Sequence, residues 1–143
     1  MKTVIMTLMV LLTSGLASAQ VNFGIGLEHS VKTHRTEVTK SKLMPRLSLG
    51  YTLELSKIFS VESSLVGTTD TARTHFNYML GIGDGLKAHV GLNLNLVDGF
   101  GAGMQTGLLI NDRYLIEYVK TNSSFDKPEW SSDSLAIGVN FGF

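Results

Sequence analysis

Seven ionisable side chains lie in segments where large apolar residues alternate with small or polar ones, and each occupies a polar position. They are Glu28, Arg46, Glu54, Glu62, Lys87, His89 and Glu117. Carboxylates and a histidine can transfer protons, and carboxylates beside basic groups can form ion pairs. Because a buried charge must be paired to be tolerated, we interpret the set as an internal network of ion pairs and hydrogen bonds. A proton path or a small pore is the alternative.

Other catalytic or metal-binding patterns are not recognisable in the chain. The histidines His29, His34 and His75 are too scattered to predict a metal site, and the sequence has no cysteine. A Gly-x-Ser-x-Gly motif is absent, and the glycine-rich segments 81–85 and 99–103 lack the lysine of a phosphate-binding loop. We therefore assign no catalytic residue, metal or cofactor from motifs.

The elements that must position these residues are β-strands. In residues 135–143 every odd position is large and apolar and every even one is small or polar, up to the terminal Phe143. Seven further segments alternate in the same way, with turn signals at Gly83-Asp84-Gly85 and Asp98-Gly99. The predicted strands are 21–31, 43–55, 59–65, 75–82, 86–96, 100–110, 114–119 and 135–143.

The first 19 residues have the form of a secretory signal peptide. Lys2 supplies a positive charge, Val4 to Leu12 a nearly continuous apolar run, and Ala17-Ser18-Ala19 a cleavage signal of small residues. The run is too short for a membrane-spanning helix. We predict cleavage after Ala19, which leaves one domain, residues 20–143.

Composition excludes several classes of protein. Without Lys2, the mature chain has 11 Lys and Arg against 12 Asp and Glu, so nothing predicts nucleic acid as a partner. The lack of cysteine excludes a disulfide-stapled scaffold and thiol chemistry.

The fold class that follows is all-β: an eight-stranded antiparallel transmembrane β-barrel behind a signal peptide. An even number of strands closes a barrel with no unpaired backbone in lipid. The longest connections, 32–42 and 121–133, fall on the same side, and the turns near Ser56, Asp84 and Asp112 on the other are short. At eight strands we expect side chains to fill the lumen.

The signal peptide, the eight alternating segments and the aromatic terminus resemble the small outer-membrane barrels of the OmpX/Ail/OmpA type. The resemblance implies a bacterial outer membrane, with Phe143 as the signal that the barrel-insertion machinery reads. It also implies a structural role or surface interactions, with a surface protein or host ligand as a possible partner.

A local resemblance points to a second function. Residues 118–123, followed by Glu129 or Asp133, are similar to the last hairpin of lipid A deacylases, which use a His-x-Ser-Asn motif. Here Lys120 stands at the histidine position and Asn122 at the serine position. A protonated lysine cannot act as a general base. The alternative function is therefore a lipid A-modifying enzyme or a degenerate, inactive relative.

Binding is expected at the outer loops. Segment 32–42 has four basic residues, Lys32, Arg35, Lys40 and Lys42, and segment 121–133 has the single tryptophan, Trp130. Basic groups can pair with the phosphates of lipopolysaccharide, and an exposed tryptophan can anchor a partner. Outer-membrane lipids and lipopolysaccharide are the expected partners. Simple solvated loops are the alternative.

Overall fold

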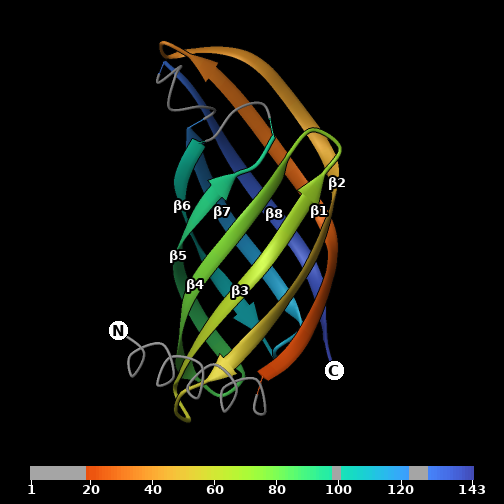
Figure 1. Cartoon of the computed structure of the whole chain (residues 1–143), viewed down its shortest axis with the longest axis vertical. Helices are drawn as coiled ribbons and strands as arrows, with labels where there is room; N and C mark the ends of the chain where they lie inside the picture. The colour runs from red at the N-terminus through yellow and green to blue at the C-terminus, as the bar shows by residue number, and fades with distance from the viewer. Residues whose placement is uncertain (1–18, 98–100, 123–128) are drawn as a thin grey trace, which may run out of the picture.

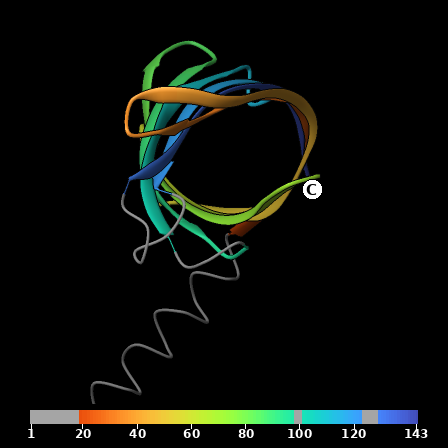
Figure 2. The same ribbon diagram turned by 90° about the horizontal axis from the view of Figure 1, so that it is seen from above.

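The computed structural model describes residues 19–97, 101–122 and 129–143. They form eight antiparallel strands: β1 (Ala19–His34), β2 (Glu37–Glu54), β3 (Phe59–Thr68), β4 (Ala72–Gly83), β5 (Leu86–Asn95), β6 (Gly101–Ile110), β7 (Tyr114–Asn122) and β8 (Trp130–Gly142). Each strand pairs with the next, and β8 pairs with β1 from Asn22↔Gly142 to His34↔Trp130. The sheet is thus a closed barrel, as Figures 1 and 2 show. The predicted fold class is confirmed.

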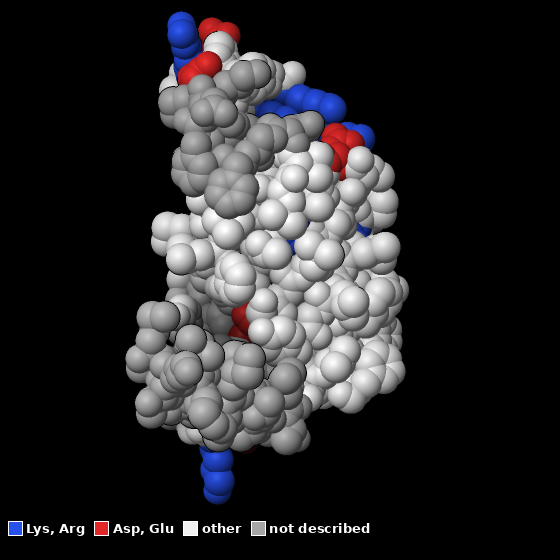
Figure 3. All heavy atoms as spheres, viewed as in Figure 1, with Lys and Arg blue, Asp and Glu red and all other residues white. Residues whose placement is uncertain are grey.

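The alternation in the sequence separates the wall of the barrel from its lumen. In β1 the side chains of Val21, Phe23, Ile25 and Leu27 point outward and are between 39% and 48% exposed. The intervening Gly24 and Glu28 are buried. Charged side chains gather mainly at the two ends of the molecule, and the wall between them is largely uncharged (Figure 3). No helix among the described residues is long and apolar enough to cross a membrane.

The strands extend further at one end of the barrel than at the other. Ala19, where the described residues begin, and the C-terminus lie at one end, the terminal end, where short turns connect the strands (Figure 1). At the other end β1, β2 and β8 continue past β3, because the β2–β3 pairing stops at Arg46↔Thr68 while the β1–β2 pairing runs on to His34↔Glu37 and the β8–β1 pairing to His34↔Trp130. We call residues 32–42 the outer hairpin and this end the hairpin end.

The prediction of a long loop over residues 32–42 is therefore wrong. Only Arg35 and Thr36 form the turn, and both have positive φ, 47° and 79°. Residues 32–34 and 37–42 continue the two strands, with a register shift between Lys32 and Thr33, and their side chains are polar on both faces except for the exposed Val38. The last loop is also shorter than predicted, because β7 ends at Asn122 and β8 begins at Trp130. Asp98-Gly99 and residue 100 lie outside the described residues.

Candidate functional site

The centre of the lumen holds a cluster of buried charges that spans the barrel. Arg46 on β2 donates to Glu117 on β7, with 2.5 Å between Nη2 and Oε1, and its Nη1 lies 3.8 Å from Glu28 on β1. Arg73 on β4 donates to Glu28 at 2.5 Å. All four side chains are at least 94% buried. The cluster contains two guanidinium groups and two carboxylates, so its charges balance.

Two histidines complete this cluster. His89 Nε2 lies 2.9 Å from Glu117 Oε2, and His75 Nδ1 lies 3.6 Å from Glu117 Oε1. Both rings are almost fully buried. Within the described residues no group of three or more acidic, histidine or cysteine side chains could hold a metal ion. The arrangement therefore supports ion pairing and proton sharing within the lumen.

A chain of amides and one hydroxyl crosses the lumen beside the charged cluster. Asn77 donates to Glu62 at 3.1 Å, and Gln105 donates to Asn77 at 2.8 Å. Asn93 donates to Gln105 at 2.9 Å and accepts from the Thr121 hydroxyl at 2.7 Å. These contacts link β3, β4, β5, β6 and β7, so hydrogen-bonded side chains tie together five consecutive strands of the barrel from inside.

The seven predicted interior residues fall into three groups. Glu28, Arg46, His89 and Glu117 meet in the central cluster, and Glu62 joins through Asn77. Lys87 instead pairs at the terminal end with Asp112, 2.7 Å away. Glu54, at the last position of β2, lies at the rim of the terminal end, where it is exposed and lines a small cavity of the lumen.

Sequence reasoning missed Arg73 and His75 as members of the cluster. The sequence carries a signal for both, because the large apolar residues of this strand, Phe76, Tyr78, Leu80 and Ile82, are even-numbered and point outward, which places the odd-numbered residues of β4 inward. Arg73 was left out because the predicted strand began at His75, whereas β4 begins at Ala72.

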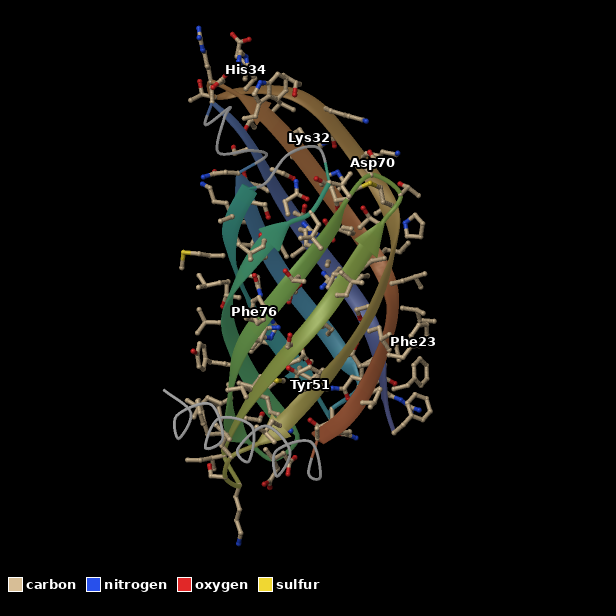
Figure 4. The ribbon with its side chains drawn as sticks, in the orientation of Figure 1. Phe23, Lys32, His34, Tyr51, Asp70 and Phe76 are labelled. Atoms are coloured by element: carbon tan, nitrogen blue, oxygen red, sulfur yellow. The ribbon has the colours of Figure 1, made fainter. Side chains whose placement is uncertain are left out.

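The outer hairpin carries a second group of charges. Lys32 pairs in register with Lys40, and Ser30 with Lys42. Register partners share a face of the sheet, and the Ser30 side chain is buried toward the lumen, so the three lysines extend the lumen-facing side of β1 and β2 beyond the barrel. We call Lys32, Lys40 and Lys42 the basic face (Figure 4).

One carboxylate offsets part of this positive charge. Asp70, in the turn between β3 and β4, lies 2.8 Å from the Lys42 ammonium and 3.4 Å from that of Lys40. The hydrogen bond from Lys42 is the main reason that the pKa of Asp70 falls from 3.8 to about 2. Among the described residues, no carboxylate lies within ion-pair distance of the Lys32 ammonium.

The remaining predicted surface residues lie at the tip. Arg35 is exposed in the turn, and its backbone N–H donates to the Glu129 carbonyl at 3.0 Å. Trp130 is on β8 rather than in a loop, and its ring packs against His34 at a tilt of 35°, with centroids 4.6 Å apart. The β8–β1 pairing holds both rings at the top of the barrel, next to the basic face.

The outward side of the same end places two polar pairs on the wall. His29 Nε2 and Ser41 Oγ lie 2.9 Å apart, and both residues are exposed. The Tyr118 hydroxyl donates to Asp133, whose register partner is Lys120. Lys120 and Asn122 are also exposed, whereas Ser123 lies outside the described residues. The wall thus brings a histidine to a serine, but at residues other than 118–123.

Comparison with known proteins identifies the fold. No protein-family model matches the sequence, and a comparison with curated proteins gave no match. Neisserial surface protein A has a similar structure, with a TM-score of 0.56 and 16% identity over 87% of this chain and 99% of that one. Ail, the attachment invasion locus protein of Yersinia pestis, has a TM-score of 0.52 and 14% identity over 88% of this chain and 99% of its own. A structure of Ail in complex with the heparin analogue sucrose octasulfate also matches, at 12% identity. The predicted resemblance is confirmed at the level of fold: this chain has the fold of the small eight-stranded outer-membrane barrels.

Proposed function

We propose that this chain is a closed outer-membrane barrel that binds anionic groups of the cell surface through the basic face of its outer hairpin. The observation that carries the proposal is the placement of Lys32, Lys40 and Lys42 on one side of the β1–β2 hairpin, which extends past β3 and is paired with β8 along β1, with Asp70 as their only ion-pair partner among the described residues. In the lumen, by contrast, the charged side chains pair with one another, which supports a role at the surface and not in transport.

The apolar wall supports a place in the bacterial outer membrane. Leucines such as Leu47, Leu49 and Leu92 are 55–58% exposed, and burial in lipid would remove that surface from water. In this setting the signal peptide is cleaved after Ala19, the terminal end faces the periplasm, and the insertion machinery reads Phe143. These points can be tested by cell fractionation, by N-terminal sequencing and by a heat-dependent gel shift. Normal assembly of a chain lacking Phe143 would contradict the last one.

We propose the phosphates of lipopolysaccharide as the first ligand. Lysine binds phosphate as a point charge, and the basic face lies at the height where a hairpin leaves the outer leaflet. The complex of Ail with a sulfated saccharide shows that a barrel of this fold binds a polyanion, which supports the same ligand chemistry here. Trp130, packed against His34, supplies an apolar surface for a sugar ring or a surface protein beside the lysines.

The test is binding of purified lipopolysaccharide to the barrel in nanodiscs. Replacing Lys32, Arg35, Lys40 and Lys42 by serine should weaken binding. Added salt should reduce the difference between this variant and the parent, because salt screens exposed charges. Serine at Lys57 and Arg113, two exposed basic residues at the terminal end, is the matched control. Equal binding by both variants, or no binding by the parent barrel, would contradict the proposed ligand.

The contact between His29 and Ser41 supports a second candidate function, hydrolysis of lipid esters at the outer wall. With its Nε2 unprotonated, His29 could accept the Ser41 proton while Oγ attacks an ester carbonyl. The ester C–O bond would then break, the alcohol would leave with that proton, and water would release the acyl group from Ser41. No carboxylate among the described residues orients the other ring nitrogen, so we expect any such reaction to be slow. Mass spectrometry of lipid A from cells with the parent chain, Ser41→Ala or no barrel distinguishes the candidates: unchanged acylation in all three contradicts the enzyme.

A further inference from the structure

We propose that the lumen is hydrated from the periplasmic end only: ordered water reaches Arg46 and His75 at mid-barrel, and the side chains above them exclude water from the hairpin end. This inference concerns the interior and does not depend on ligand binding by the outer hairpin.

Three small cavities connect the terminal end to the central cluster. The lowest, about 20 Å³, is lined at the rim by Gln20, Glu54, Lys87 and Asp112. The next, also about 20 Å³, reaches Arg46, His75, His89 and Glu117, and a third of about 10 Å³ adjoins it. All three share Asn140 as a lining residue. A volume of roughly 10–15 Å³ is enough for one water molecule, so the cavities hold a short file of water and not an open channel.

Some polar side-chain atoms at the central cavity have no hydrogen-bond partner in the protein, and water could be that partner. Arg46 Nη1 and both ring nitrogens of His75 are buried without a hydrogen bond, and both residues line this cavity. Buried donors and acceptors are nearly always bonded to protein or to ordered water. Water in the cavity could form hydrogen bonds with these atoms. The same cavity is lined by other polar residues, such as Ser48, Ser64 and Asn140, which could also bond to that water.

Side chains toward the hairpin end form the seal. Met44, Val66 and Val119 are at most 2% exposed, and Asn93 and Gln105 bond to each other at 0% and 2% exposure. Thr121, 4% exposed, donates to Asn93 from above. These residues come from five strands and leave almost no exposed surface, and the side chains of Asn93, Gln105 and Thr121 are hydrogen-bonded within the protein.

His75 is the natural probe of this asymmetry, because it lies where the file of water ends. Titratable or charged groups surround it from every neighbouring strand: Glu28 on β1, Arg46 on β2, Glu62 on β3, Arg73 on β4, His89 on β5 and Glu117 on β7. Protons can reach this group along the water only from the periplasm. The lumen is then a one-sided vestibule and not a proton path across the membrane.

Deuterium exchange at the Cε1 hydrogens of histidine, read by mass spectrometry in refolded barrels, tests the proposal. Asn140→Leu keeps the side-chain size but removes the polar lining shared by the three cavities, and should slow exchange at His75 by about tenfold or more if the file supplies the water. Thr121→Val, of matched size in the seal, should leave it unchanged. Measuring each variant across pH separates a change in access from a change in pKa, and His34 on the hairpin serves as the exposed reference.

Three outcomes would overturn the proposal: parent exchange at His75 too slow to detect over days, equal rates in Asn140→Leu and the parent, or slowing by Thr121→Val as large as that by Asn140→Leu. A heat-dependent gel shift verifies that each variant is folded. Should Asn140→Leu not fold, magnetisation transfer from water to the Arg46 and His75 side chains in the parent barrel provides a second measurement. Its absence would show a dry lumen.

Discussion

Arg46 and Glu117 stand 71 positions apart in the chain and form an ion pair across the full width of the barrel, from β2 to β7, at 2.5 Å. Their strands are not neighbours in the sheet. The pair therefore fixes opposite walls of the barrel relative to each other, and it joins the Glu28–Arg73 pair through the second arm of the Arg46 guanidinium.

Removal of one member of this pair should be costly. Arg46→Met leaves Glu117 and Glu28 short of a cation in a buried site, and breaking a buried pair in this way costs about 3–5 kcal/mol. The double variant Arg46→Met, Glu117→Leu should be more stable than the single one, because no unpaired charge stays behind. Reversible urea unfolding, followed by the fluorescence of Trp130, measures both, with exposed Arg113→Met as the control. A double variant less stable than the single one would show that the Glu117 carboxylate is held by its histidines alone.

Close strand contact makes one glycine hard to replace. A Cβ at Gly103 would lie 1.8 Å from the Lys120 carbonyl oxygen and 2.6 Å from Thr121 Cα, both backbone atoms that cannot swing away. We expect Gly103→Ala to destabilise the barrel by about 1–3 kcal/mol. Gly67→Ala is the matched control, since a Cβ there meets no atom within 4 Å. Equal stability of the two variants would contradict the β6–β7 packing.

The two faces of β5 should respond to substitution for different reasons. Leu92 is 58% exposed on the wall, so Leu92→Arg places a charge against lipid and should cost about 2–4 kcal/mol, whereas Leu92→Met should be nearly neutral. Asn93 is fully buried and bonds to Gln105 and Thr121. Asn93→Ser should therefore cost about 1–3 kcal/mol, more than a generic polar lumen position would. A tolerated Leu92→Arg in lipid vesicles would mean that this wall does not face lipid.

The sequence predicts the wall far better than the lumen. The two-residue alternation is a local signal, and it identified all eight strands and the outward position of residues such as Phe23, Tyr78 and Ile137. Contacts across the lumen depend on register and strand tilt, which no local pattern carries. Arg46 could thus be placed inside but not next to Glu117, and the ends of β1 and β2 were missed because polar strands outside the membrane look like loops.

The pH dependence of the outer hairpin follows from Asp70. Its pKa is lowered to about 2, mainly by the hydrogen bond from Lys42. A carboxyl with a lowered pKa stabilises the folded contact at pH values above its ordinary 3.8, and this contribution is lost as the pH falls through about 2. A carboxyl carbon titration by NMR should therefore give a midpoint near 2 in the parent and one closer to 3.8 in Lys42→Ser. Lys57→Ser, at the other end, should leave the midpoint unchanged, and a parent midpoint near 3.8 would show that the ion pair is absent in solution.

Asp70 also predicts a gain of binding. Because it stays ionised at physiological pH beside Lys40 and Lys42, it competes with any anionic ligand for their ammonium groups. Asp70→Asn removes this competitor and should strengthen binding of lipopolysaccharide a few-fold at low salt, the opposite sign to serine at the lysines, with the difference shrinking as salt screens the charges. Asp84→Asn, on an exposed turn at the terminal end, is the matched loss of one negative charge and should have no effect. If Asp70→Asn instead weakens binding, the carboxylate positions the lysines for the ligand; if both Asn variants strengthen it equally, the protein's net charge and not the basic face attracts the anion.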